Sequence, residues 1–466
     1  MKVILAGYNI DVTQLTSKEG NFTPETISAA YARISRSKKS VDDLRTDAIL
    51  DVEKSRRSNK KIVFEMGHSS IAEHAVFNFD IIGISRYLTE FVQRTRLASF
   101  TEKSQRYVTL DGDYIISEEI QHDNVILTQY NDTIQEQNQT YRILYEQLKN
   151  YFEQTSSLPK KELEGRAKED ARYVLSMATQ TQMGMTLNAR SLEHLLKRLY
   201  ALNLSEAKTL ADSLYEKVKE VTPSLIRYIE PSDYDMEKYR TDVAEGSQSK
   251  NDKCILLSHT PQADETILAG LLFRSTGRDF QKVLDDVKRM TTHEKEEILD
   301  RHLNNLTCHD SLPREFELAD MLFQVNISSS CFAQLKRHRI ATIISTDYSP
   351  RFGYTMPKSI DKIVQKDLFI RNMNRTEQMY KILSDSYPEI RNYILTNAHH
   401  KTVLFKCNMR ELCHFSRLRQ DKHAQWDIRD LANIIIEQAR EVAPLTSRLI
   451  CGKDQFPKIN GNVEEE

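Results

Sequence analysis

A duplication that spans most of the 466-residue chain constrains its fold more than any other feature of the sequence. The segment from Arg94 to Tyr107 returns in altered form at Arg337-His338-Arg339-Ile340-Ala341-Thr342. Other matches keep the same order: Lys2–Leu5 with Lys253–Leu256, Gly83–Ser85 with Asn326–Ser328, and Asn188–Arg190 with Asn408–Arg410. The period is far too long for a solenoid, so the sequence predicts two tandem copies of a whole domain.

The repeat predicts where the domains begin and end. We expect a first copy at residues 1–230, a polar linker at 231–252, a second and diverged copy at 253–450, and a loose tail at 451–466. Each copy is long enough to bury its own core. The mixed element pattern predicts an α/β (α+β) class, with a sheet packed against helices and a helical subdomain in each copy.

Several elements of the first copy can be predicted from local signals. Thr23-Pro24 indicates the start of a helix that runs through about Ser35, and a second helix is expected at 41–65. The alternation in 75–82 predicts a strand, and the spacing in 85–94 a helix. The ranges 124–149 and 163–199 are rich in helix formers.

Composition limits the classes of partner. Hydrophobic residues make up 39% and charged residues 28% of the chain, which is typical of a soluble globular protein. A net charge of −2 gives no electrostatic reason to expect nucleic acid, and no apolar run approaches the roughly 20 residues of a membrane span. The N-terminus resembles a first strand rather than a signal peptide. Six scattered cysteines without a C-x-x-C pair predict reduced thiols in a cytoplasmic protein and no metal site.

The segment that follows the predicted helix at 85–94 is dense in polar groups. Arg94 and Arg96 precede Glu102, Ser104 and Arg106. Guanidinium groups suit phosphate and carbonyl oxygens, and an ionised glutamate accepts hydrogen bonds from a ribose hydroxyl or a ring N–H. The alternative is a surface cluster of ion pairs. The return of Arg-x-Arg in the second copy favours a functional role.

This segment resembles the signature R-H-R-x-x-S-x-N-E-x-S-x-R-Y of the flavin-dependent thymidylate synthases. The first copy departs from it at Thr95, where the family has histidine, and at Thr101, where it has asparagine. The resemblance includes Gly67–His74, which is similar to the family's G-H-x-S-x-x-E-H. It covers most of residues 1–230 and, more weakly, 253–450.

The two copies retain different parts of the family pattern. The first keeps Glu102, Ser104 and Arg106, whereas the second has the full Arg337-His338-Arg339, preceded by Gln334 where the first copy has Phe91. Only the second copy carries the late family arginine, at Arg419. The resemblance therefore implies one composite active site that draws on both copies.

The resemblance also implies a reaction and its ligands. The reaction is reductive methylation of dUMP to dTMP, with FAD as cofactor and methylenetetrahydrofolate and NADPH as co-substrates. The implied catalytic residues are Arg419 and Glu102. The implied dUMP-binding residues are Glu102, Ser104, Gln105, Arg106, Gln334, Arg391, Arg172 and Arg419. The implied FAD-binding residues are Ser35, His74, Arg94, Arg96, Arg337, His338, Arg339, Asn408, Arg410 and His414.

Family members assemble from subunits that share active sites, so two of these chains are expected to form a homodimer equivalent to a tetramer. Two alternatives remain open from the sequence. The changes at Thr95 and Thr101 are compatible with a related flavoenzyme that modifies another uridine nucleotide. A non-catalytic nucleotide-binding paralogue is the third hypothesis, although unselected decay would not spare complementary halves.

Overall fold

The computed structural model describes residues 1–16, 22–106, 112–238, 253–307 and 309–456. It divides into two compact units. Unit 1 consists of Met1–Ala244 and Lys358–Thr396, and unit 2 of Glu245–Pro357 and Asn397–Glu466. These units are spatial bodies, whereas the boundaries expected above follow the sequence repeat. Residues 358–396 belong to the second copy in sequence and to unit 1 in space.

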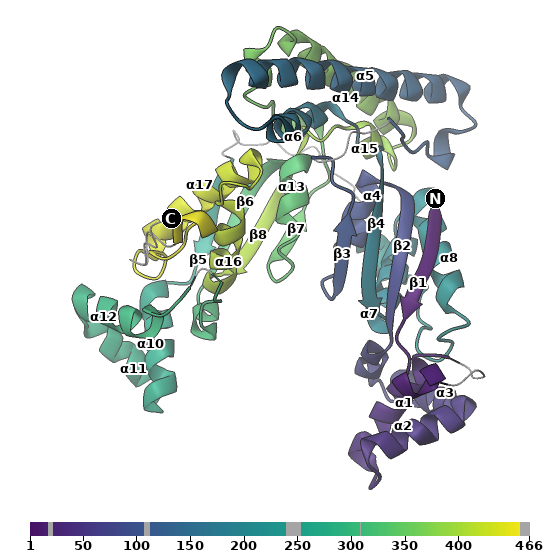
Figure 1. Ribbon diagram of the computed structural model, residues 1–466, viewed down its shortest axis with the longest axis vertical. Helices are drawn as coiled ribbons and strands as arrows, with labels where there is room; N and C mark the ends of the chain where they lie inside the picture. Colours follow the sequence, from purple (N-terminus) through teal and green to yellow (C-terminus); the bar gives the residue numbers. More distant parts are fainter. Residues whose placement is uncertain (17–21, 107–111, 239–252, 308, 457–466) are drawn as a thin grey trace. The chain divides into compact units, whose positions relative to one another are not determined.

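Each unit contains a four-stranded antiparallel sheet with the same topology (Figure 1). In unit 1 the order is β1 (Lys2–Tyr8), β2 (Val76–Ser85), β4 (Gln180–Asn188) and β3 (Ala98–Glu102). In unit 2 it is β5 (Cys254–His259), β6 (Asp320–Ser328), β8 (His400–Asn408) and β7 (Thr342–Ser345). Strands that match in the sequence repeat occupy the same place in the two sheets. The tandem duplication and the mixed α and β class are therefore confirmed.

Alternating apolar residues set the buried face of each sheet. Phe77, Phe79 and Ile81 of β2 are buried, and Phe323 and Val325 of β6 fill the corresponding face in unit 2. Side chains two apart point to the same side of a strand, so these runs place one face of each sheet in its core.

One glycine distinguishes the two central strands. The pairing of β2 with β4 shifts register between Ile82 and Ile84, and Gly83 has a φ of +74° that side-chain-bearing residues rarely adopt. The matched strand β6 has Asn326 at this position and pairs with β8 without a shift.

Corresponding helices of the two copies are capped by the same residue types. Ser85 accepts from the backbone N–H of Leu88 at the start of α4 (Arg86–Val92), and Ser328 does so for Cys331 at the start of α13 (Ser329–Leu335). Asn188 and Asn408 cap the helices that follow β4 and β8, namely α7 (Ala189–Tyr200) and α16 (Met409–Arg419). Each cap satisfies a backbone donor that would otherwise lack a partner, so each strand-to-helix turn is fixed locally.

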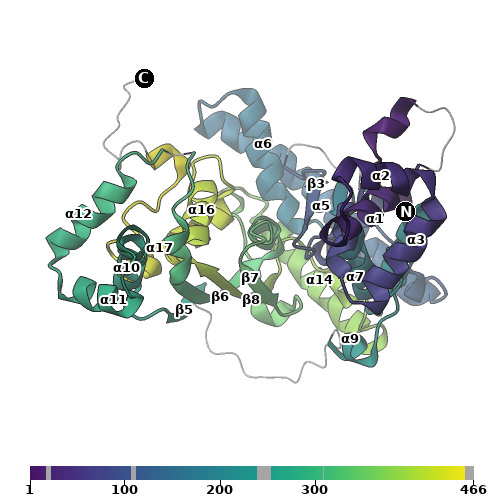
Figure 2. The same cartoon turned by 90° about the horizontal axis from the view of Figure 1, so that it is seen from below.

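Further helices complete each unit (Figures 1 and 2). Unit 1 also contains α1 (Glu25–Arg33), α2 (Val41–Leu50), α3 (Val52–Lys60), α8 (Ser205–Val218) and α9 (Asp233–Lys238). Unit 2 contains α10 (Ala263–Thr276), α11 (Phe280–Arg289), α12 (Thr292–Leu303) and α17 (Trp426–Val442). No helix in the described ranges is long and apolar enough to cross a membrane.

A helical layer of unit 1 combines segments from both copies (Figure 1). The helices α5 (Asn124–Thr155) and α6 (Lys160–Ala171) come from the first copy, and α14 (Lys366–Ser386) and α15 (Arg391–Ile394) from the second. Gln137 on α5 donates to Thr376 Oγ1 on α14 at 2.8 Å and to the carbonyl oxygen of Ile394 at 2.9 Å. The second copy is thus tied into the body of the first.

A buried carboxylate anchors this layer to the sheet. Glu206 on α8 accepts from the backbone N–H and the hydroxyl of Ser85, both at 2.7 Å, and from the Tyr393 hydroxyl at 2.5 Å. Burial raises the pKa of Glu206 above its ordinary value, and the three donors oppose that rise. Tyr393 belongs to the second copy, so this network also joins the two copies.

Two expectations from the sequence require correction. The helix expected at 41–65 is interrupted at Asp51, whose carboxylate accepts from the N–H of Lys54 at 2.8 Å and so starts α3 as a separate helix. The helix-rich range 163–199 contains the strand β4, in which Met183, Met185 and Leu187 alternate on the buried face. The helix expected after Thr23-Pro24 is confirmed as α1. Residues 239–252 of the expected linker and 457–466 of the expected tail lie outside the described residues.

Candidate functional site

The carboxylate of Glu102 is held at the end of β3 by two donors from α4 and the turn after it. Arg86 forms an ion pair with Glu102 Oε1, and Gln93 Nε2 donates to Oε2 at 2.9 Å. The side chains of Arg86 and Glu102 are 9% and 8% exposed. The carboxylate is therefore held in a fixed orientation by groups of the protein itself.

Two arginines flank Glu169 close to the expected nucleotide segment. Arg106 Nη1 lies 3.2 Å from Glu169 Oε2, and the backbone N–H of Arg106 donates to Ser104 Oγ at 3.2 Å. Arg172 is buried and donates from Nε to the backbone carbonyl of Glu169 at 3.3 Å. Burial lowers the pKa of Arg172, while Glu169 opposes the shift. Arg106 thus contacts the carboxylate of Glu169, and Arg172 contacts the backbone carbonyl of the same residue.

The other residues expected in unit 1 occupy varied positions. Gln105 is buried, whereas Ser35, His74, Arg94 and Arg96 are exposed. The guanidinium of Arg94 lies 4.7 Å from the ring centroid of Phe91, and His74 packs edge-on against Tyr31 at 4.8 Å. Arg391, from the second copy, lies on α15 in unit 1 with its guanidinium 5.9 Å from the Tyr380 ring centroid. It thus shares a unit with Arg106 and Arg172.

Position 95 shows how the copies have diverged. Thr95, where the resemblance expects histidine, is buried, and its hydroxyl accepts from Arg198 Nη2. The matched residue in the second copy is His338, which is also buried but has different partners. Of the two matched positions, only the one in unit 2 therefore keeps the histidine that the resemblance expects.

In unit 2, His338 lies between the carboxylate of Glu411 and the guanidinium of Arg419. Its Nδ1 lies 3.0 Å from Glu411 Oε1, and its Nε2 accepts from Arg419 Nε at 3.0 Å. Arg419 also donates from Nη1 to Gln334 Oε1 at 3.1 Å. Burial lowers the pKa of His338, and Arg419 adds to this effect. Three residues expected from the sequence, Gln334, His338 and Arg419, thus form one hydrogen-bonded group.

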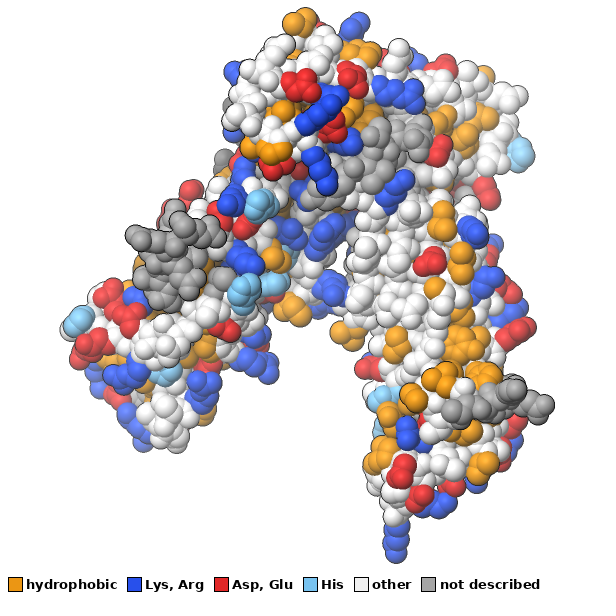
Figure 3. All heavy atoms as spheres, in the orientation of Figure 1, with side chains coloured by type: hydrophobic (Ala, Val, Ile, Leu, Met, Phe, Trp, Pro, Cys, Tyr) orange, Lys and Arg blue, Asp and Glu red, His pale blue; other side chains and the backbone are white. Residues whose placement is uncertain are grey.

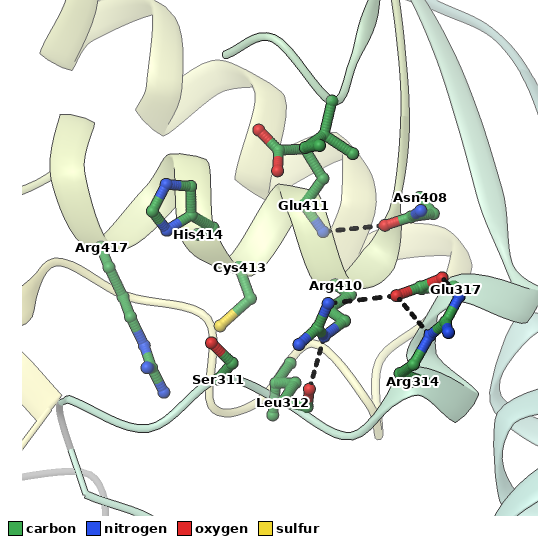
Figure 4. A pocket seen from close by; sticks show the side chains of 11 residues that line it. Ser311, Leu312, Arg314, Glu317, Asn408, Arg410, Glu411, Cys413, His414 and Arg417 are labelled. Atoms are coloured by element: carbon green, nitrogen blue, oxygen red, sulfur yellow. Dashed lines mark hydrogen bonds and ion pairs between the residues drawn. The ribbon is translucent and has the colours of Figure 1, made fainter. Parts of the chain in front are cut away.

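Glu411 links this group to a neighbouring cavity of about 520 Å³ (Figure 4). The lining residues are Ser311, Leu312, Arg314, Glu317, Ile340, Asn408, Arg410, Glu411, Cys413, His414 and Arg417. Arg410 donates from Nε to the carbonyl oxygen of Leu312 at 2.7 Å and from Nη1 to Glu317 Oε1 at 3.1 Å. Arg417 stacks on Phe456 at 4.9 Å and donates to the carbonyl oxygen of Asp310.

Three of these lining residues were expected from the sequence, namely Asn408, Arg410 and His414. Sequence reasoning missed Arg314, Glu317 and Arg417. The signal for Arg417 was present, because residues 410, 413, 414 and 417 follow the spacing of one face of a helix. Figure 3 shows Lys, Arg and His side chains close together on the surface around α16. Arg337 is exposed and Arg339 half-buried, and neither lines the cavity.

A family model described as thymidylate synthase complementing protein matches residues 19–224 and 255–445. The chain belongs to this family. The two matched segments correspond to the two copies, and together they cover most of the sequence.

Curated relatives fall into two lengths. A flavin-dependent thymidylate synthase from Clostridium tetani is 33% identical over 211 residues, which is 45% of this chain and 83% of the relative. A UPF0159 protein from Thermoplasma acidophilum is 25% identical over 437 residues, covering 84% of this chain and 87% of the relative. One group thus matches a single copy and the other both copies.

Solved structures show a weaker likeness. A flavin-dependent thymidylate synthase from Helicobacter pylori, complexed with FAD and dUMP, is 20% identical with a TM-score of 0.30, covering 49% of this chain and 100% of that one. A UMP/dUMP methylase from Streptomyces cacaoi is 17% identical with a TM-score of 0.36, covering 44% and 97%. The family match and the curated relatives together indicate an enzyme of the flavin-dependent thymidylate synthase type.

Proposed function

We propose that the protein is a flavin-dependent thymidylate synthase that methylates dUMP at C5, with methylenetetrahydrofolate as carbon donor and NADPH as reductant of the flavin. The observation that carries this proposal is the group of Gln334, His338 and Arg419, in which the guanidinium is oriented by two acceptors. Membership of the thymidylate synthase complementing protein family supports the proposed reaction class.

The cavity beside α16 has a donor set that suits a nucleotide cofactor. Arg314, Arg410 and Arg417 offer guanidinium groups to phosphate oxygens, while Leu312 and Ile340 offer apolar surface to a ring. Asn408, Arg410 and His414 would hold FAD there. The resemblance to the family pattern adds seven further residues to the proposed FAD-binding set: Ser35, His74, Arg94, Arg96, Arg337, His338 and Arg339. FAD, when bound, supplies the hydride for the reduction.

Arg106 and Arg172 are proposed to bind the phosphate of dUMP. Both guanidinium groups contact Glu169, Arg106 at its carboxylate and Arg172 at its backbone carbonyl, so the two cations lie near one another. Charge-assisted hydrogen bonds to phosphate are among the strongest that a protein makes. Glu102, with Ser104 and Gln105, would accept and donate hydrogen bonds to the ribose and the pyrimidine. Gln334 and Arg391 complete the proposed nucleotide set.

Arg419 is proposed to stabilise the negative charge that the uracil carbonyls gain when C5 becomes nucleophilic. A preorganised cation contributes most where charge develops in the transition state. His338 and Gln334 fix the plane of the Arg419 guanidinium, so little reorganisation is needed when that charge appears. No nucleophilic side chain is required for this chemistry.

Both copies are proposed to contribute to each working site. Glu102, Ser104 and Arg106 are retained in the first copy, and Gln334 and Arg419 in the second. We also propose a cytoplasmic homodimer equivalent to a family tetramer. We keep, as part of this proposal, the division of the sequence into two copies joined by a linker at 231–252.

A second candidate is a related flavoenzyme that acts on another uridine nucleotide. The observation that favours it is Thr95, which has replaced the family histidine and accepts a hydrogen bond from Arg198. A non-catalytic nucleotide-binding paralogue is the third candidate, and the flavin content of the purified protein separates it from the other two.

Tritium release tests the proposal directly. The purified chain should show a flavin absorption band, and it should release tritium from C5-labelled dUMP when folate and NADPH are supplied. Labelled UMP under the same conditions identifies the second candidate. A flavin-loaded protein that releases tritium from neither nucleotide would contradict both.

A further inference from the structure

A second cavity lies in unit 1, bounded by α1, α2, α3 and the turn of π-helix at Lys61–Glu65. Its volume is about 610 Å³. The lining residues are Arg33, Ser37, Lys39, Leu44, Asp47, Lys54, Arg57, Ser58 and Lys61. None of the residues assigned above to FAD or to dUMP lines it.

The charges in this cavity are strongly unbalanced. Five of its lining residues are cationic, namely Arg33, Lys39, Lys54, Arg57 and Lys61, and Asp47 is the one carboxylate among them. The whole chain, in contrast, carries a net charge of −2. Short helices with exposed basic residues are common, but this cavity gathers basic residues from α1, from the turn before α2, from α3 and from the π-helix after it, and so concentrates positive potential.

Asp47 offsets only part of this charge. Lys39 Nζ lies 2.6 Å from Asp47 Oδ2, so this carboxylate is already paired. The hydrogen bond from Lys39 lowers the pKa of Asp47, and the charges of Lys54 and Arg33 lower it further. Within the part of the chain that the structure describes, no ion pair joins Arg33, Lys54, Arg57 or Lys61 to a carboxylate. Four cations thus remain for a ligand.

The remaining groups suit phosphate oxygens. Arg33 and Arg57 present planar guanidinium groups that bind phosphate through paired hydrogen bonds, and the lysines act as point charges. Ser37 and Ser58 add hydroxyl donors. Leu44, which is 4% exposed, provides apolar surface in the wall. A single phosphate group would satisfy only part of this set, whereas a chain of phosphates can reach all of it.

We propose that the cavity between α1, α2 and α3 is a binding site for an oligophosphate group, carried either by a nucleoside triphosphate or by a free polyphosphate chain. None of the residues that line the cavity is assigned to the methylation reaction, although Ser35 of the proposed FAD set lies in sequence between the lining residues Arg33 and Ser37. Its occupant is recognised by several adjacent negative charges, and affinity therefore falls as salt rises.

Titration calorimetry of the full chain with tripolyphosphate at low ionic strength tests this site. The variant Lys54→Glu/Arg57→Glu should raise the dissociation constant at least about ten-fold, since two attractive charges become repulsive. Arg36→Glu/Lys60→Glu is the matched control, because it makes the same charge change on exposed neighbours that do not line the cavity. The control should shift the dissociation constant less than about three-fold. Arg106→Ala should leave it unchanged, which separates this cavity from the proposed nucleotide site.

Two further ligands identify the source of the phosphates. Tighter binding of ATP than of tripolyphosphate indicates a nucleoside triphosphate, and equal binding indicates recognition of the phosphate chain alone. Absence of tripolyphosphate binding, equal weakening by both double variants, or equal affinity for tri-γ-glutamate would each overturn the proposal.

Discussion

Arg419 donates a hydrogen bond from its Nε to Nε2 of His338 at a distance of 3.0 Å. An always-protonated guanidinium can only donate, so His338 accepts at Nε2 and its ring proton lies on Nδ1, where it faces Glu411 at 3.0 Å. The hydrogen bonds that link Arg419, His338 and Glu411 therefore all run the same way, with Arg419 donating to His338 and His338 donating to Glu411. A neutral imidazole is the form that this arrangement requires.

Replacing Arg419 should reduce turnover while leaving the fold and the flavin in place. Arg419→Ala is expected to lower kcat for dUMP methylation by about 10²–10³-fold, the range seen when one preorganised donor is removed from a developing charge. Tritium release from labelled dUMP measures the rate, and the flavin band reports cofactor retention. Lys422→Ala, an exposed cation three residues farther on, is the control and should keep full activity.

Replacing Arg106 should affect nucleotide binding more than chemistry. A phosphate contact has the same strength in the ground state and in the transition state, so Arg106→Ala should raise KM for dUMP at least about ten-fold with a smaller change in kcat. Arg166→Ala removes an exposed arginine from α6, the helix that carries Glu169, and should change neither constant. A fall in kcat with unchanged KM would assign Arg106 to a different role.

Acid should destabilise unit 2 through His400. Burial lowers the pKa of His400 to about 4, and its ring nitrogens contact Thr355 Oγ1 at 2.7 Å and the Phe352 carbonyl oxygen at 3.1 Å. Between an unfolded pKa of about 6.5 and a folded value near 4, only the unfolded chain takes up the proton. Stability is therefore full above about pH 6.5 and falls by up to about 3 kcal/mol as the pH approaches 4.

Urea unfolding at a series of pH values checks this dependence. His400→Gln should flatten the fall in the free energy of unfolding below pH 6.5. His293→Gln, at a side chain that is 80% exposed, should leave it as it is in the parent protein. If the free energy of unfolding depends on pH identically in the parent and in His400→Gln, then His400 does not cause the loss of stability in acid.

Removing the Tyr393 hydroxyl should destabilise unit 1. Tyr393→Phe deletes one of three donors to the buried Glu206 carboxylate, and the expected cost is about 1–3 kcal/mol, because a charged acceptor is left less well satisfied. Tyr228→Phe, at a position that is 53% exposed, is the control and should be neutral within about 0.5 kcal/mol. Chemical denaturation followed by circular dichroism measures both.

Internal repetition made much of the fold predictable. Strands β2 and β6 alternate clearly, and the Ser85 and Asn188 caps have counterparts at Ser328 and Asn408, so one copy supported the interpretation of the other. The strand β4 was missed because Met183 and Met185 are good helix formers and their alternation is visible only against the sheet. The break at Asp51 was missed because aspartate is tolerated within a helix, and only the contact with Lys54 shows that it caps one.

Some residues of the candidate site were singled out from the sequence, and others were found only from the structure. The family resemblance singled out His338 within the signature and Gln334 and Arg419 outside it, and the structure brings these three residues into one hydrogen-bonded group. Their roles in binding or catalysis stay predictions. Arg314 and Glu317 were not singled out, because both reach the cavity from one short 3-10 helix, Arg314–Leu318, that carries no such pattern. Long-range placement decides which charged residues line a cavity, and local spacing does not encode that placement.

The helices α14 and α15 make the folding of unit 1 depend on the later half of the chain. They are encoded in the later half of the sequence, yet they pack within the body formed by the earlier half. A gene cut at the junction would leave the first product with the buried side of α5 exposed to water, and that product would tend to aggregate. The covalent link between the halves therefore supplies α14 and α15 to unit 1 within one molecule, and folding of this body needs no encounter between two chains.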